Sequence, residues 1–67
     1  MAEFYVILRD EEYYKEMDGK ESKAIGLDRV IAVNAFELTR QKSPISYWGI
    51  TFERVEPNKV KVITPFG

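Results

Sequence analysis

Five carboxylates and two tyrosines in residues 10–18 are the side chains with the most obvious capacity for chemistry. Paired carboxylates can serve as general acid and base, and clustered oxygens can hold a divalent cation. The order "DEEYYKEMDGKE" lacks the alternating acids around a central glycine that a calcium loop needs. A short chain also has little room to bury two carboxylates and tune their pKa values. The segment therefore favours a recognition surface over a catalytic or metal site.

The sequence contains no histidine and no cysteine among its 67 residues. That composition removes the commonest general base, the best nucleophile and every zinc site of the usual Cys/His kind. The serines have no neighbouring base, and the four glycines are too scattered for a phosphate-binding loop. We therefore expect a non-enzymatic protein without a metal or other cofactor.

Charge is unevenly distributed along the chain, whose formal net charge is −1. Residues 1–18 carry six acidic and two basic side chains, whereas basic side chains predominate in residues 19–67. Acids flanked by tyrosines suit a protein interface, because tyrosine adds apolar area with few rotatable bonds. The simpler alternative is a solvated helix face. The predicted partner-binding surface consists of Asp10, Glu11, Glu12, Tyr13, Tyr14, Glu16 and Asp18.

A second candidate surface combines basic and aromatic residues near the C-terminus. Aromatic rings stack on unpaired bases while lysine and arginine contact phosphates, as in single-stranded nucleic-acid binding. The near-neutral net charge argues against binding through many phosphate contacts, so direct nucleic-acid binding is the weaker hypothesis. Its predicted residues are Tyr47, Arg54, Lys59 and Lys61.

The elements that must position these surfaces begin with "EFYVILR", an apolar run that predicts a strand central in its sheet. Alternation places Phe4, Val6 and Leu8 on one face, and Tyr5 and Ile7 on the other. If no element covers the second face, the exposed apolar strip suggests a homodimer.

For residues 10–18 the pattern favours a short helix. Asp10 suits the N-cap and Gly19 the C′ position, with an apolar stripe of two tyrosines and a methionine between them. The alternative is an excursion between strands at residues 13–17. The polar "DGKESKAIG" that follows is predicted to be a surface loop.

The middle segment, "LDRVIAVNAFELTRQKSP", has two interpretations. One helix over residues 28–42 places Val33 and Phe36 opposite the other apolar residues and is poorly amphipathic. Alternatively, "RVIAV" is a short buried strand, Asn34 caps a helix "AFELTRQK", and Pro44 ends it. We favour the second interpretation.

The clearest element is a C-terminal hairpin with strands "SYWGITFERV" and "VKVIT" and the turn "EPNK". Pairing Glu56 with Lys59 places Arg54 opposite Lys61. A four-residue loop with a shifted register is an alternative. The final "TPFG" is a tail whose Phe66 either packs onto the fold or acts as an anchor. In the favoured register, the core face carries Trp48, Ile50, Phe52 and Ile63.

Together these elements predict a single domain over residues 1–67 of the α+β class. The expected architecture is a single-layer, mainly antiparallel sheet of three or four strands with one or two short helices on one face. The sequence has no run of ~20 apolar residues and no basic segment ahead of an apolar one. We therefore expect no membrane association and a cytoplasmic location.

This general layout, with its strand ending "VNA", short "FELTRQ" helix and terminal hairpin, resembles the small host-blocking proteins of bacteriophages and mobile elements. These include anti-CRISPR proteins and phage inhibitors of host polymerase. The resemblance implies a viral inhibitor in the host cytoplasm that occludes a larger, nucleic-acid-handling host protein, often through acidic residues. It carries no individual site residue. A structural subunit of a larger assembly is a further alternative.

Overall fold

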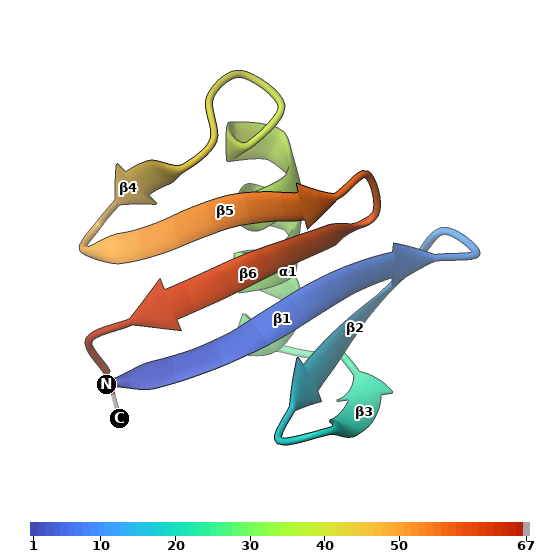
Figure 1. Ribbon diagram of the computed structural model, residues 1–67. Coiled ribbons are helices and arrows are strands. Elements are labelled where there is room, and N and C mark those ends of the chain that lie inside the picture. The colour runs from blue at the N-terminus through green and yellow to red at the C-terminus, as the bar shows by residue number, and fades with distance from the viewer. Residues whose placement is uncertain (67) are drawn as a thin grey trace.

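The computed structural model describes residues 1–66, which form one sheet with one helix packed on a single face (Figure 1). The six antiparallel strands follow the order β3-β2-β1-β6-β5-β4. The α+β class is confirmed, but the expected three or four strands are too few. In chain order the elements are β1 (Ala2–Arg9), β2 (Glu12–Met17), β3 (Lys20–Lys23), α1 (Leu27–Leu38), β4 (Ile45–Tyr47), β5 (Ile50–Glu56) and β6 (Lys59–Thr64).

β1 lies at the centre of the sheet between β2 and β6, as its apolar run predicts. Its alternate side chains enter the core under α1, which confirms the predicted division of its two faces. Tyr5 and Ile7 lie on the face that α1 does not cover. The buried core comprises Phe4, Val6, Phe52, Val60 and Val62 from the sheet and Ala32, Ala35 and Phe36 from the helix.

The helix predicted for residues 10–18 is wrong, because this segment is part of a three-stranded meander. Asp10 and Glu11 form a two-residue turn with φ of 53° and 62°. Asp18 and Gly19 form the next, with φ of 53° and 78°. Positive φ at both central residues is what a type I′ hairpin turn requires. β3 occupies the predicted surface loop, so that prediction is also wrong.

α1 is a single helix of twelve residues, so the favoured split into strand and helix is wrong. Ala32 and Ala35 are fully buried and let the helix approach the sheet closely, with Phe36 beside them. The helix seemed poorly amphipathic because Val33 and Phe36 lie opposite Leu27 and other apolar residues. In the structure Phe36 is buried, whereas Leu27 and Val30 point to solvent, so the core face of α1 is narrow and rests on the two alanines and Phe36.

The C-terminal hairpin is confirmed, including the pairing of Glu56 with Lys59 across the turn. A bulge between Arg54 and Glu56 then shifts the register by one residue. Arg54 consequently lies opposite Val60, and the predicted like-charge pair of Arg54 with Lys61 does not form. The bulge instead aligns Lys61 with the acidic residue that precedes Arg54.

The shift also changes which residues reach the core. Val62 is fully buried and packs with Phe52, whereas Ile63 turns to the uncovered face. The predicted first strand is interrupted at Trp48 and Gly49, whose φ values of 55° and 77° make a turn between β4 and β5. The core positions predicted for Ile63 and Trp48 are therefore wrong.

Arg54 ties the end of α1 to the β5–β6 hairpin. Its Nη2 donates to the Phe36 carbonyl at 2.8 Å and its Nη1 to the Pro57 carbonyl at 2.8 Å. Its Nε donates to Thr39 Oγ1 at 3.0 Å. The guanidinium thus satisfies a carbonyl of the last helical turn that has no partner within the helix.

We expect Arg54→Ala to lower the free energy of unfolding by about 1.5–3 kcal/mol, since it removes charge-assisted hydrogen bonds to partly buried acceptors. Arg54→Lys should recover little, because an ammonium cannot reach three acceptors in the same fork. Urea denaturation gives the measurement. Arg40→Ala is the control, because Arg40 is exposed and contacts only Glu37 at 3.4 Å. Equal effects of Arg54→Ala and Arg40→Ala would contradict this account.

Candidate protein-docking surface

Ion pairs and rings cover the face of the sheet that α1 leaves open. Side chains of opposite charge meet there between adjacent strands and also across an intervening strand. Arg9 lies over the Tyr14 ring at 4.7 Å, and Lys59 lies over the Tyr5 ring at 4.7 Å. The ion pairs are Arg9 with Glu21, Lys23 with Glu12 at 2.6 Å, Lys59 with Glu16 at 3.4 Å and Lys61 with Glu3 at 3.4 Å.

These ion pairs and rings bear on the prediction that Tyr5 and Ile7 form an exposed apolar strip. Ile7 is only 9% exposed, and the Tyr5 ring carries the Lys59 ammonium. The strip is therefore not an open apolar surface, and it gives no support to a homodimer formed through this face.

The strand geometry disperses the predicted acidic surface. Glu12, Tyr14 and Glu16 lie on the open face, where each contacts a cationic side chain. Tyr13 points the other way and its ring lies 5.8 Å from that of Phe36. The remaining members, Asp10, Glu11 and Asp18, lie in two different turns.

The predicted nucleic-acid surface is also not brought together. Lys59 and Lys61 lie on the open face in ion pairs, whereas Arg54 lies on the helix side with its guanidinium engaged. Tyr47 lies in the edge strand β4. No single surface presents all four residues.

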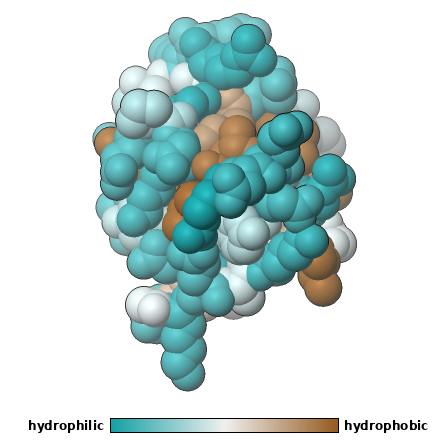
Figure 2. Space-filling view, turned by 90° about the vertical axis from the view of Figure 1, so that its right-hand side faces the viewer, coloured by the Kyte–Doolittle hydropathy of each residue, from teal (hydrophilic) through white to brown (hydrophobic). Residues whose placement is uncertain are grey.

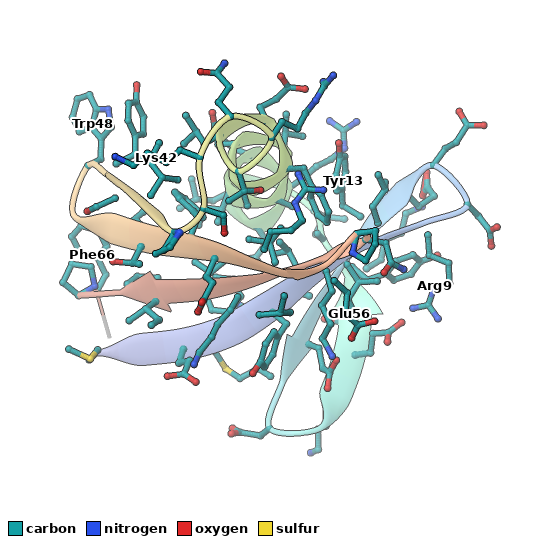
Figure 3. All side chains as sticks on the ribbon, turned by 45° about the horizontal axis from the view of Figure 1, so that its top comes forward. Arg9, Tyr13, Lys42, Trp48, Glu56 and Phe66 are labelled. Carbon is teal, nitrogen blue, oxygen red and sulfur yellow. The ribbon has the colours of Figure 1, made fainter. Side chains whose placement is uncertain are left out.

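One end of the molecule gathers exposed apolar side chains. Figure 3 shows Trp48 and Phe66 at this end, with Arg9 and Glu56 at the opposite end. Trp48 is 80% exposed and Leu27 is 73% exposed, although large apolar side chains usually pack. We name this surface the apolar end; its exposed members are Met1, Leu27, Val30, Tyr47, Trp48 and Phe66.

A groove of about 330 Å³ runs through the apolar end between α1 and the β4–β5 turn. No charged side chain lines it, and Asn34 is its one polar residue apart from the Tyr47 hydroxyl. A wider basin of about 700 Å³ adjoins it and shares part of its wall. The groove is lined by Leu27, Val30, Ile31, Asn34, Tyr47, Trp48, Ile50 and Phe52.

Trp48 occupies a backbone position that disfavours it. Its φ of 55° lies in the left-handed region, where Gly, Asn and Asp are usual and a bulky side chain is strained. The turn between β2 and β3 has Asp18 at the corresponding position, which is the expected choice. The indole contacts the Tyr47 ring edge-on at 6.2 Å and otherwise faces solvent. Folding alone therefore gives no reason for tryptophan here.

Sequence reasoning missed the apolar end because it assigned Trp48 to the core and favoured a buried strand over residues 29–33, where Val30 belongs to α1 and is exposed. A Trp-Gly pair between two apolar runs was the available signal for a turn, since Gly readily adopts positive φ.

The opposite end differs in character. Seen from the side of the β1–β2 and β5–β6 turns, the surface is largely hydrophilic, with hydrophobic side chains in a central area and at the margins (Figure 2). Glu56 lies at this end (Figure 3), as does the β1–β2 turn with Asp10 and Glu11, and none of the three acids has an ion-pair partner within residues 1–66. We name it the hydrophilic end.

Within the described part of the chain, no three acidic side chains come together in a way that could hold a metal ion. The one helix of residues 1–66 is neither long nor apolar enough to cross a membrane.

Comparisons with protein-family models, with curated proteins and with solved structures found no match.

The Glu12–Lys23 pair gives the open face a pH dependence. The hydrogen bond and charge of Lys23 hold the pKa of Glu12 below its ordinary value of 4.5. The same contact raises the pKa of Lys23 above its ordinary value of 10.5. A lowered carboxyl pKa contributes stability above the unfolded-state value and loses it in acid, whereas a raised lysine pKa contributes below 10.5 and loses it in alkali.

We expect Glu12→Gln to reduce stability slightly near neutral pH, with the difference disappearing as the pH falls through the folded-state pKa of Glu12. The effect is small because both side chains are exposed. Denaturation of both proteins across a pH series gives the measurement. Asp18→Asn is the control, because it removes an acid without an ion pair in the described chain. Its difference in stability from the wild type should not change with pH in this way. A difference that grows toward acid would contradict the assignment.

Proposed function

We propose that this chain is a non-enzymatic protein-binding module that docks through its apolar end. The observation that carries the proposal is Trp48, an exposed indole held at positive φ where Asn or Asp would be easier. Strained residues that packing does not require are commonly kept for a functional contact.

The surroundings of Trp48 support a protein as the partner. Tryptophan and tyrosine are enriched among the residues that dominate binding energy, and they act best beside a pocket that excludes water. Here Tyr47 adjoins Trp48, and an apolar groove lies next to both. The absence of histidine and cysteine from the sequence gives no support to a catalytic role.

In this proposal the chain acts as small phage inhibitors do, by occupying a surface of another protein without chemical change. The proposed contact surface is the apolar end, whereas the composition of the sequence favoured the acidic residues and tyrosines of residues 10–18. The acidic residues of β2 neutralise neighbouring bases, so the apolar end replaces them as the principal contact surface.

Trp48→Asn tests the proposal without threatening the fold. We expect it to leave the free energy of unfolding unchanged or raise it by up to about 1 kcal/mol, because asparagine tolerates positive φ. We expect the same variant to lose the proteins that the immobilised wild-type chain retains from host lysate.

Val55→Asn is the matched control, because Val55 is an exposed apolar residue outside the groove and the basin. It should retain the same proteins as the wild type. Equal retention by Trp48→Asn and the wild type would overturn the proposal.

A second candidate function is binding of a basic partner surface through the acidic side chains of the hydrophilic end. The favouring observation is that Asp10, Glu11 and Glu56 project there without ion-pair partners in the described chain. Such acids suit a basic, nucleic-acid-handling surface and steer association.

Replacing Asp10 and Glu11 together by lysine should then slow capture of a basic partner at least several-fold at low salt, with less effect at high salt. Asp18→Lys is the control, because Asp18 is an exposed acid in a turn outside the hydrophilic end. Association rates measured by surface plasmon resonance decide the matter. If the double variant and Asp18→Lys behave alike, the acids at the hydrophilic end have no special role.

A further inference from the structure

We infer that the partner of the apolar end is a second copy of this chain, with Trp48 of each copy seated in the groove of the other. This inference rests on the proposed function, since it names the partner of the same surface.

The first argument is that a projecting side chain and a matching groove lie next to each other. Trp48 projects from the β4–β5 turn, and the groove opens beside it against Val30 and Ile31 of α1. A twofold axis between two such surfaces brings each indole to the other copy's groove, so each copy gives and receives one ring. The groove of about 330 Å³ has room for an indole.

The second argument is the amount of apolar surface. At roughly 150–250 Å² per aromatic side chain, the exposed parts of Tyr47 (49%), Trp48 (80%) and Phe66 (66%) amount to about 400 Å². The exposed Leu27 and Val30 extend this area toward the ~800 Å² that each partner contributes to a standard interface. A chain of 7.8 kDa has few other ways to cover such a surface.

The third argument is charge. No charged side chain lines the groove, so it selects neither an acidic nor a basic partner. In the adjoining basin, Asp28 is paired with Lys15 at 3.3 Å and Glu3 with Lys61 at 3.4 Å, so Asp18 is the one acid there without an ion pair in the described chain. Two copies therefore meet there without strong repulsion. Glu56 and the β1–β2 turn lie at the opposite end of the molecule from Trp48 (Figure 3).

The single tryptophan of the sequence makes the test direct. Sedimentation equilibrium should give twice the 7.8 kDa mass of the chain at high concentration, falling to one chain on dilution. The Trp48 fluorescence maximum should shift to the red over the same concentration range, as the indole leaves the partner's groove for water.

Two variants address the two halves of the contact. Trp48→Asn removes the projecting ring, and Leu27→Glu places a charge at the groove while suiting the first turn of α1. Each should raise the dimer dissociation constant by about 30-fold or more. Val55→Asn, at an exposed apolar position outside the groove, should leave the dissociation constant unchanged.

The outcomes separate this inference from the proposed function. A mass of one chain up to about millimolar concentration, or a dimer that persists in Trp48→Asn, overturns the inference. If the chain is monomeric but Trp48→Asn still loses capture of another protein, the proposed function stands and the partner is different. If the chain is monomeric and Trp48→Asn also captures as the wild type does, both proposals fall.

Discussion

One helix of twelve residues packs on a six-stranded sheet, and that shortage of cover constrains the rest of the surface. A sheet face without a layer above it must be made compatible with water by its own side chains. Here the outward side chains of β3, β2, β1 and β6 mix acids, bases and rings, so that each base reaches an acid or a ring on a neighbouring strand. Of the five carboxylates that looked like a recognition surface, Glu12 and Glu16 are therefore engaged in covering the sheet, whereas Asp10, Glu11 and Asp18 lie in turns.

The same shortage acts on the covered face. Ala32 and Ala35 bring α1 close to the central strands, where Val6, Val60 and Val62 are fully buried. Close approach seals the centre but leaves the periphery of the layer open. Arg54 closes one side by binding the end of α1 to the β5–β6 turn. Toward the β4–β5 turn no side chain of residues 1–66 makes such a link to α1, and there the groove opens.

The sequence was sufficient to predict an element where its residue pattern is typical of only one kind of structure. The apolar run of β1 predicted a central strand with two correct faces, and Pro57-Asn58 predicted the β5–β6 turn. It failed where one signal serves two structures. Asp-Gly at residues 18–19 ends helices and also makes type I′ hairpin turns, and only pairing with β1 and β3 decides between them. The bulge at Arg54 could not be predicted either, because it depends on the helix carbonyl that the side chain reaches.

The remaining failures all fall on the apolar end, and their location is informative. Leu27 was among the apolar residues that made α1 look unlike an amphipathic helix, and Trp48 was assigned to a core that it does not enter. Each assignment assumed that a large apolar residue is placed for folding. That assumption is sound for most of a stable domain, so a cluster of exceptions indicates a second requirement on the same residues. The strained φ of Trp48 agrees, since an easier residue was available for the turn alone. Contact with another molecule is the requirement that accounts for exposure, clustering and strain together.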